Sequence, residues 1–556
     1  MRKKTSPFRH ILCMVCFFSY HIQAQEIQLE ISPKDSLTSA HPLLQHLKEE
    51  HSTLESLANY LQEFKTSLET KGYLNPIQNF SKKSDSSYKV SLDLRTKVDS
   101  ISIDTSELTD RPPFLSTKND AIRIPIEDTQ IFLKKLNHYY HEKGATFHKI
   151  ELTHIQSIQK NLFAHLRVSK TSLRKIDKII THGYSLFPKR FISKHLQLKP
   201  HIVFNKNLLK KTNERLQSLD FITQTAPPKA LFTKDSTMIY LYLQKRKANV
   251  FDGLVGFSNR ENSKKIRLNG YLTLLLKNTF HRGETISFEW KNNGDDLEQL
   301  FFSTESPYIY NSPFSPAFEF KLQRKDSSFV NTRFNFDVGV ALNFNHQFFL
   351  SVDTESSQSN LVVKTGAIQN FSKTNYGVIY QFVKNHSENG KPTTSLSLLF
   401  KRGQRSSENE VEKQFLFASE ISHRFQIFGR NTLFLKNKSE LIDSSNLLNN
   451  ELYFLGGTNT IRGFNELSLQ ASAYNYTNAE YQFSTDSFSY LYLFADVGFL
   501  KNNTLASEDT LLGTGIGYSY RTPSGNINIS YALGKTNKTS FDLEKGLFHI
   551  KFVSYF

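Results

Sequence analysis

Residues 455–464 carry the most distinctive motif of the chain, which reads Leu455-Gly456-Gly457-Thr458-Asn459-Thr460-Ile461-Arg462-Gly463-Phe464. Glycine adopts positive φ angles at little steric cost, so Gly456, Gly457 and Gly463 predict tight turns and a close approach to other backbone. Arg462 offers a planar fork of hydrogen-bond donors beside the last glycine. We therefore expect a compact loop that folds into an interior, with Phe464 packing its tip. A surface turn with a solvated arginine is the alternative.

Two further motifs follow this loop towards the C-terminus. The first is Phe494-Ala495-Asp496-Val497-Gly498, and the second comprises Gly513, Gly515 and Gly517, followed by Arg521, Pro523 and Gly525. The glycine run lacks the spacing and the strand-to-helix context of a dinucleotide-binding loop. The sequence also shows no nucleophile elbow and no histidine pair at metal-binding spacing on a helix. We therefore expect no enzyme activity, no cofactor and no metal.

Residues 248–556 alternate apolar and polar side chains in segments of about ten residues, as the strands of outer-membrane barrels do. The alternation is clean where Ile527, Ile529, Tyr531 and Leu533 interleave with Asn526, Asn528, Ser530 and Ala532. The chain has 47 Phe and 24 Tyr but a mean hydropathy of −0.43, which suits a barrel with aromatic girdles and a polar lumen. Allowing about 19 residues for each strand and its connection, this half predicts a transmembrane antiparallel β-barrel of about 16 strands. A soluble β-sandwich is the alternative.

The first and last strands of such a barrel must pair to close it. We expect the first strand at residues 249–257 and the last at residues 546–556. Gly253 and Gly256 give the first strand few packing side chains, so this seam is predicted to be weak. One face of the last strand carries Phe548, Ile550, Phe552, Ser554 and Phe556.

The N-terminal half contains a repeated pattern. Leu61, Phe64, Leu68, Lys71 and Gly72 recur, at a constant offset of 72, as Leu133, Leu136, Tyr140, Lys143 and Gly144. Apolar residues at this spacing line one helix face, and the glycine is expected to end the helix in a left-handed conformation. A third copy follows at an offset of 76, with Asp220 in place of the cap glycine, because Asp adopts that conformation more easily than most residues.

Each predicted helix is followed by two extended segments, and the second and third are also preceded by one. The following pairs are 77–80 with 88–94, 148–154 with 161–168, and 222–225 with 238–243; the preceding segments are 100–103 and 175–180. These β-α-β-β units predict repeats at 25–96, 97–173 and 174–247, ahead of the barrel at 248–556. Unrelated α+β domains with similar helix spacing are the alternative, which five matches at one offset argue against.

Residues 1–24 predict a cleaved secretory signal, because four basic residues precede an apolar stretch at 11–20. Cys13 and Cys16, the only cysteines, lie within it, so we expect no disulfide and no Cys-bound zinc. Of the net charge of +17, residues 151–247 hold +14, with 19 Lys and Arg against 5 Asp and Glu. An exported protein rarely meets nucleic acid, so no nucleic-acid partner is expected. We hypothesise that this basic segment contacts anionic lipid or an acidic partner, a solvated surface being the alternative.

The three C-terminal motifs, in this order, resemble those of the BamA/TamA outer-membrane assembly superfamily, also called the bacterial surface antigen family. The repeats resemble its α+β polypeptide-transport-associated (POTRA) repeats, and their number makes the chain most like a TamA-type member. The resemblance implies that Arg462 meets Asp496 on an inner-wall strand that also carries Gly498. The terminal Phe556, with alternating apolar residues before it, resembles the targeting signal of outer-membrane barrels, from which Ser554 departs.

The resemblance implies a cell outer membrane protein with its repeats in the periplasm. Its expected function is protein assembly or translocation: the repeats capture unfolded outer-membrane or secreted polypeptides by β-augmentation and pass them to a laterally opening barrel in contact with outer-membrane lipid. The resemblance also admits an inner-membrane-anchored periplasmic partner. Two alternatives stay open. One is a two-partner-type polypeptide secretion pore, with residues 35–56 as its plug helix, and the other is a passive outer-membrane channel or receptor.

Overall fold

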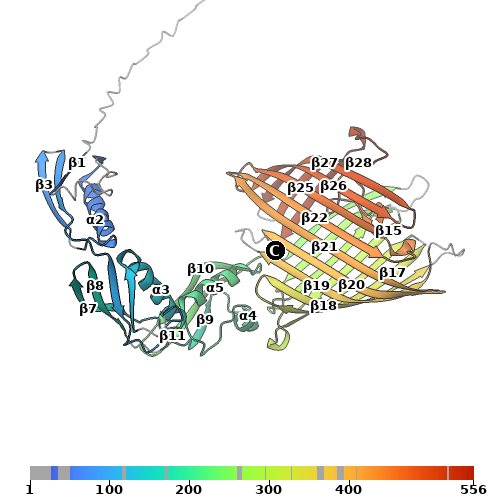
Figure 1. Ribbon diagram of the computed structural model, residues 1–556. Helices are drawn as coiled ribbons and strands as arrows, with labels where there is room; N and C mark the ends of the chain where they lie inside the picture. The colour runs from blue at the N-terminus through green and yellow to red at the C-terminus, as the bar shows by residue number, and fades with distance from the viewer. Residues whose placement is uncertain are drawn as a thin grey trace, which may run out of the picture. The chain divides into compact units, whose positions relative to one another are not determined.

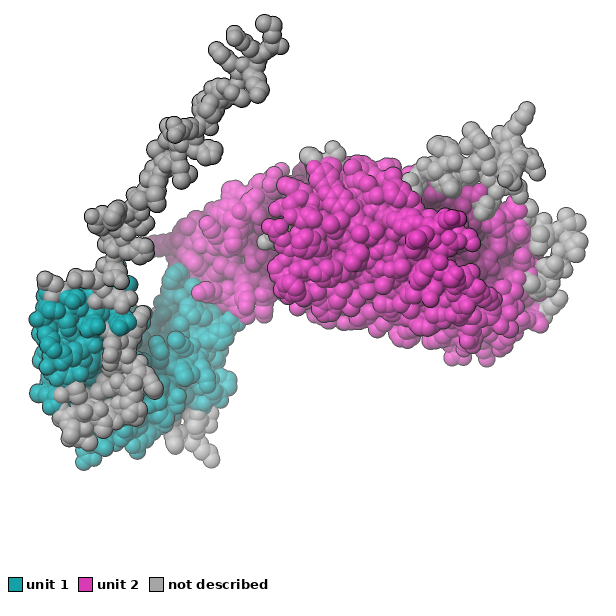
Figure 2. All heavy atoms as spheres, turned by 90° about the horizontal axis from the view of Figure 1, so that it is seen from above, with its two compact units in different colours: residues 1–173 teal, residues 174–556 magenta. Residues whose placement is uncertain are grey.

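The computed structural model describes most of the chain and divides it into two compact units. The described residues are 27–34, 50–74, 76–84, 86–115, 120–169, 173–259, 266–294, 296–326, 328–359, 368–384, 393–408, 410–522 and 525–556. The expected signal at 1–24 and most of the possible plug helix, residues 35–49, lie outside this part. The two units are residues 1–173 and 174–556 (Figure 2). In the described part, the helices lack either the length or the apolar character that crossing a membrane requires.

The first unit contains two four-stranded sheets of the same strand order. The first sheet, ordered β2-β1-β4-β3, comes from β1 (Ile27–Pro33), β2 (Glu50–His51), α2 (Leu54–Thr70), β3 (Ile77–Ser84) and β4 (Ser87–Asp93). The second, ordered β6-β5-β8-β7, comes from β5 (Ser100–Asp104), β6 (Ala121–Pro125), η2 (Ile126–Asp128), α3 (Thr129–Glu142), β7 (Ile150–Ile158) and β8 (Asn161–Val168). In both sheets, the first strand along the chain (β1 or β5) pairs in parallel with the last strand (β4 or β8). The first unit thus has a leading strand, β1, that the sequence reading had assigned only to the later repeats.

The helices α2 and α3 end as their glycines predict. Gly72 and Gly144 have φ angles of 99° and 89°, in the region that favours glycine. Leu68 of α2 and Leu136 of α3 are fully buried and Tyr140 of α3 is buried, so these repeated apolar positions do pack inward. At the other end of α2, the hydroxyl of Thr53 accepts from the backbone N–H of Ser56 at 3.1 Å and caps the helix.

A third α+β sheet opens the second unit and departs from the pattern. It comprises β9 (Lys178–His182), α4 (Lys189–Lys194), α5 (Lys206–Gln217), β10 (Ile222–Phe232) and β11 (Thr237–Lys245), in the order β10-β11-β9. The expectation that Asp220 takes the place of the cap glycine is wrong. The residue that caps helix α5, Ser218, has a right-handed conformation. Asp220 has no positive φ, and its carboxylate pairs with Lys277 of the barrel.

Sixteen antiparallel strands close the barrel (Figure 1), which confirms the predicted strand number and excludes the β-sandwich. They are β12 (Val250–Asn259), β13 (Ile266–Lys277), β14 (Thr285–Asn292), β15 (Leu297–Glu305), β16 (Phe314–Lys325), β17 (Phe329–Ala341), β18 (His346–Ser359), β19 (Phe371–Lys384), β20 (Thr394–Ser407), β21 (Val411–Phe428), β22 (Asn431–Asp443), β25 (Ala473–Ser484), β26 (Ser489–Asn502), β27 (Ser507–Thr522), β28 (Gly525–Lys535) and β29 (Leu547–Tyr555). We call the end at which β11 leads into β12 the near rim, and the opposite end the far rim.

The side-chain alternation of the strands separates a polar lumen from an apolar outer face. On β28, Ser530 and Ala532 are buried on the lumen side. Because successive side chains of a strand point to opposite faces, Ile529 and Tyr531 lie on the outer face, as expected. The apolar residues of the last strand are likewise exposed, among them Phe548, Ile550, Phe552 and Phe556.

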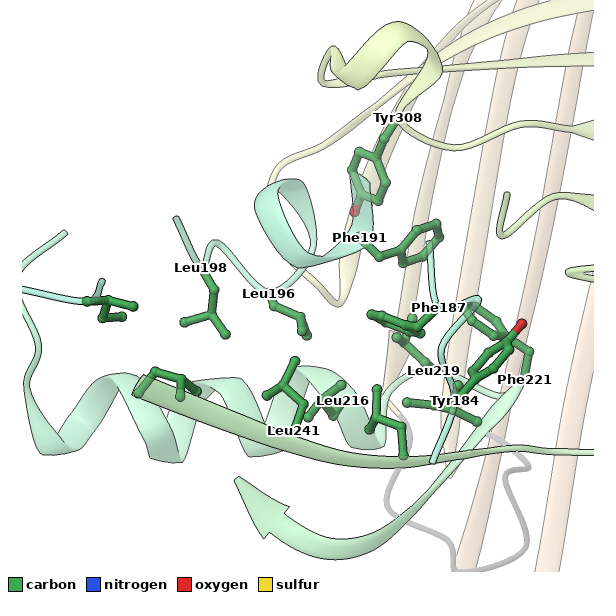
Figure 3. Close-up of a cluster of buried hydrophobic side chains, with 14 of the residues drawn as sticks. Tyr184, Phe187, Phe191, Leu196, Leu198, Leu216, Leu219, Phe221, Leu241 and Tyr308 are labelled. Atoms are coloured by element: carbon green, nitrogen blue, oxygen red, sulfur yellow. The ribbon is translucent and has the colours of Figure 1, made fainter. Parts of the chain in front are cut away.

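The third sheet is docked on two near-rim turns of the barrel. Tyr308 of the turn between β15 and β16 points toward Phe191 of α4 (Figure 3), with the ring centroids 5.2 Å apart in an edge-on arrangement. Gly283, in the turn between β13 and β14, leaves room for the Phe191 ring, which a Cβ there would overlap. Beside them, the hydroxyl of Tyr184 lies 2.7 Å from Nδ1 of His281. Aromatic packing therefore fixes this sheet to the barrel.

Candidate functional site

The loop between β22 and β25, residues 444–472, leaves the far rim and folds into the barrel; we call it the lumen loop. It contains η4 (Asn449–Glu451) and a short hairpin of β23 (Tyr453–Leu455) and β24 (Leu469–Ala471). Gly456, Gly457 and Gly463 have φ angles of 110°, 98° and 88°, as their turns require. The surface-turn alternative does not hold, because Arg462 is only 7% exposed.

Arg462 and Asp496 form a buried ion pair half-way along β26. The backbone N–H and Nε of Arg462 both donate to Oδ2 of Asp496, at 2.9 and 2.8 Å, and Nη2 donates to Oδ1 at 2.6 Å. The remaining Nη1 pairs with Glu480 of β25, and the guanidinium carbon lies 3.8 Å from the centroid of the Phe494 ring. Asp496 is fully buried, and among the described residues Arg462 is the cation with which it forms an ion pair.

The glycines of β27 make room for this arrangement. A Cβ at Gly515 would overlap the Phe494 ring, and one at Gly517 would overlap the ring of Tyr492. At Gly513, a Cβ would overlap the carbonyl oxygen of Arg462. The three glycines therefore leave a smooth strip of wall on which the aromatic rings and the loop tip rest.

Further glycines bring the loop tip against the wall on either side of Arg462. A Cβ at Gly498 would lie 2.6 Å from Cδ1 of Ile461, which is fully buried. Gly463 meets the backbone of β28 at Gly534, where a side chain on either residue would clash. Phe464 is partly buried and packs against the cluster that contains Ile461. The motif residues from 455 to 464 thus form one packed unit with β26 to β28.

A second anchor of the lumen loop, Glu451, escaped the sequence reading. Its carboxylate is buried and accepts from Nη1 of Arg405 on β20 and from Nε2 of Gln414 on β21, both at 2.7 Å. Lys373 of β19 lies 3.9 Å away on the same side. Beside it, Nδ2 of Asn450 donates to the hydroxyl of Ser357 at 2.7 Å. The loop is therefore tied by charge to two separate stretches of wall.

The seam between β12 and β29 is short. Among the described residues, the two strands pair at four positions, from Val250 opposite Tyr555 to Gly253 opposite Phe552, all at the near-rim end. By contrast, β12 pairs with β13 at ten positions, and β28 with β29 at eight. Gly253 lies in the seam as expected, whereas Gly256 faces Asn269 of β13 and no described residue of β29. Gly253 thus lies in the paired part of the seam, and Gly256 lies on the same strand beyond it.

An ion pair on the lumen side joins the seam strands to each other and to the loop. Nζ of Lys551 on β29 lies 2.8 Å from Oδ2 of Asp252 on β12 and donates to Oδ1 of Asn459 in the lumen loop at 3.2 Å. The hydroxyl of Tyr271 on β13 donates to Oδ1 of Asp252 at 3.2 Å. The state of the seam and the seating of the lumen loop are thus connected through one ammonium group.

The predicted outer-face residues of β29 lie where the alternation puts them. Phe548 and Ile550 precede the part of β29 that pairs with β12, and Phe552 and Ser554 lie within it. Ser554 stands opposite Phe251 of β12, so the departure from the apolar pattern falls inside the seam. Among the residues of the second glycine motif, Pro523 lies outside the described part, and Arg521 lines a cavity at the near rim.

Comparison with protein-family models matches residues 278–552 to the Omp85 superfamily domain. Among solved structures, CdiB from Acinetobacter baumannii has a TM-score of 0.52 at 14% identity, and CdiB from Escherichia coli a TM-score of 0.51 at 12% identity; each match covers 90% of this chain and 98% of that chain. BamA from Haemophilus ducreyi lacking POTRA domains 1–3 matches with a TM-score of 0.46 at 13% identity, over 77% of this chain and 93% of that chain. No curated protein matches the sequence significantly. The CdiB likeness shows a shared fold, a barrel preceded by small α+β domains.

Proposed function

Because the chain belongs to the Omp85 superfamily, whose barrels lie in the outer membrane, we propose that it inserts unfolded polypeptides into that membrane or translocates them across it. In this proposal the near rim faces the periplasm, and the three α+β sheets capture the client there. Their number supports a TamA-type member of the assembly branch. The barrel then acts without catalysing a chemical reaction.

The short seam carries this proposal. Past Gly253 on β12 and before Phe552 on β29, the two strands do not pair with each other in the described part of the chain. Each backbone N–H or C=O left unpaired in lipid costs several kcal/mol, about as much as a strong hydrogen bond in an apolar medium. A client strand that pairs with these edges removes that cost. The seam therefore supports a role as a template for strands entering the membrane.

The edges of the α+β sheets support the capture step. β3 and β7 are the outer strands of their sheets, and most of their residues are exposed. An extended peptide adds to such an edge through its main chain, so binding tolerates many sequences. Clients of unrelated sequence could thus be held in extended form before they reach the barrel.

Depletion of the protein, followed by quantification of outer-membrane and secreted proteins, tests the proposal. We expect several unrelated barrels to decrease and to recover when the wild-type chain is expressed again. Loss of one large secreted protein alone would favour the two-partner secretion pore. If no outer-membrane or secreted protein changes, both proposals are wrong. A large, steady conductance of the purified barrel would then favour the passive channel.

A further inference from the structure

A cavity of about 820 Å³ opens at the near rim of the barrel; we call it the near-rim cavity. Its walls come from the start of β12, the end of β13 and the rim segments of β21 to β29. Five basic residues line it: Arg246, Lys247, Lys277, Arg424 and Arg521. The two acidic residues of the lining are Asp220 and Asp486. The cavity therefore carries a net positive charge, and its volume lies in the range of ligand-binding pockets.

The acidic residues of the lining do not neutralise the arginines. Asp220 pairs with Lys277. Asp486 is engaged by its own turn, because its carboxylate accepts from the N–H groups of Phe488 and Ser489, at 2.6 and 2.8 Å, and from the Ser489 hydroxyl at 2.6 Å. Within the described residues, no carboxylate forms an ion pair with Arg246, Lys247, Arg424 or Arg521. Four cations thus remain for a ligand.

The arginines of the cavity face the lumen and not the lipid. Arg521 lies two positions after Ser519, which is buried on the lumen side of β27. Arg424 lies ten positions after Gln414, whose side chain binds Glu451 of the lumen loop, so the two share a face of β21. The guanidinium of Arg424 stacks on the Phe434 ring at 4.3 Å, which leaves its edge available for hydrogen bonds. An anionic ligand must therefore enter from the aqueous end of the barrel.

We propose that the near-rim cavity binds an acidic segment of the polypeptide client as it enters the barrel. This inference rests on the proposed function and names the chemistry of the client that the barrel favours. Carboxylates would be held by charge-assisted hydrogen bonds from Arg424 and Arg521, and the positive field of the enclosed rim would raise their local concentration. Tyr490 and Tyr555, which also line the cavity, offer hydroxyls and ring faces to the rest of the segment.

Peptide binding to the purified full-length protein in detergent tests the proposal. The probes are two fluorescent twelve-residue peptides of alternating Glu-Ser and alternating Gln-Ser. We expect the Glu peptide to bind about tenfold more tightly, and the double variant Arg424→Gln/Arg521→Gln to reduce that preference about tenfold. The control is Arg430→Gln, which removes one positive charge, against two in the double variant, from an exposed near-rim turn; Arg430 does not line the cavity, and its substitution should change affinity less than about twofold.

Three outcomes would overturn the inference: equal binding of the two peptides, an equal loss in Arg430→Gln, or retention of the preference in the double variant. A double variant that instead loses affinity only for phosphatidylglycerol vesicles would assign the charges to the membrane. A shift in electrophoretic mobility between unheated and heated samples verifies that the barrel of each variant is folded. The peptide-binding result is independent of the depletion result. Depletion can reduce other outer-membrane barrels even if the protein does not prefer the Glu peptide. Conversely, the protein can prefer the Glu peptide even if its depletion leaves those barrels unchanged.

Discussion

Nζ of Lys551 lies 2.8 Å from Oδ2 of Asp252, so an ion pair inside the lumen joins the last barrel strand to the first. The two residues flank the end of the short ladder, because Asp252 stands opposite Val553 and the pairing stops one position later. Separation of β12 from β29 at this level must break the contact. The same ammonium group holds Asn459, so opening also releases one contact of the lumen loop.

Removing this ammonium should loosen the last strand. Lys551→Gln leaves Asp252 with the hydroxyl of Tyr271 as its remaining partner, and we expect faster deuterium uptake over residues 547–555 than in the wild type. Lys545→Gln is the control, because that lysine is exposed and pairs with Asp542 in the far-rim connection. Unchanged uptake in Lys551→Gln would show that the ladder alone holds the seam.

A disulfide across the seam should block function if clients enter the membrane there. Phe251 and Ser554 stand directly opposite each other, at a separation that a disulfide spans in antiparallel strands. We expect Phe251→Cys/Ser554→Cys to fail to restore outer-membrane proteins after depletion under oxidising conditions, and to restore them after reduction. Ile516→Cys/Tyr531→Cys joins β27 to β28 in the same way and should be active in both states. Full activity of the oxidised seam variant would contradict lateral opening.

Truncation of either partner of the buried loop pair should destabilise the barrel to a similar extent. Arg462→Ala leaves the buried Asp496 charge uncompensated, and Asp496→Ala removes the buried partner of Arg462 and leaves it paired with Glu480, at about 3–5 kcal/mol each. The double variant should be no less stable than either single one, as measured by thermal unfolding in detergent. Glu480→Ala should cost less, since that carboxylate is more exposed. Strictly additive losses would show that the two residues act independently.

Loss of the second anchor should open the lumen to ions. Glu451→Ala removes the carboxylate that pairs with Arg405 and lies 3.9 Å from Lys373, and it frees the start of the lumen loop. We expect a higher single-channel conductance in planar bilayers, together with a shift toward anion selectivity. Glu544→Ala, on the far-rim connection before β29, is the control for charge alone. A conductance equal to that of the wild type would mean that the loop stays seated without this carboxylate.

The docked third sheet should respond to mild acid through His195. Nδ1 of His195 lies 3.1 Å from the hydroxyl of Tyr308, and burial lowers the pKa of His195 to about 4. As the pH falls from about 6.5 to 4, His195 takes up a proton in the unfolded chain but not in the folded chain. The free energy of unfolding should therefore decrease by about 1–3 kcal/mol over this range. His195→Gln should flatten this dependence in thermal unfolding, whereas His201→Gln, at an exposed position, should not. Equal pH profiles for the wild type and His195→Gln would contradict this assignment.

The sequence predicted best what depends on local pattern. Side chains of a strand alternate between its two faces because of the backbone geometry alone. This alternation therefore located the barrel strands and the outer face of β28. The strand β1 has the same alternation in Ile27, Leu29 and Ile31 and was overlooked. The pairing of Arg462 with Asp496 was implied by the family resemblance and not by any local rule.

What the sequence did not predict depends on contacts between distant segments. Glu451 follows two asparagines in a polar stretch, and its partners Arg405 and Gln414 lie on other strands, so no local feature marks it. The docking of Phe191 needs Tyr308 at a φ of 57°, a conformation that a non-glycine side chain rarely adopts. The position of Asp220 likewise depends on a distant residue, because its carboxylate pairs with Lys277 of the barrel.

The distribution of the loop anchors sets an order of assembly. The charged partners of Glu451 lie on β19 and β20, and those of Arg462 lie on β25 and β26, all within a contiguous run of neighbouring strands. This run contains neither β12 nor β29. A sheet still open at its ends can therefore hold the lumen loop through these ion pairs, and the contact between Lys551 and Asp252 forms when the ends meet. The lumen loop can thus be in place before β12 and β29 pair, which makes the pairing of these two edge strands the last step of barrel closure.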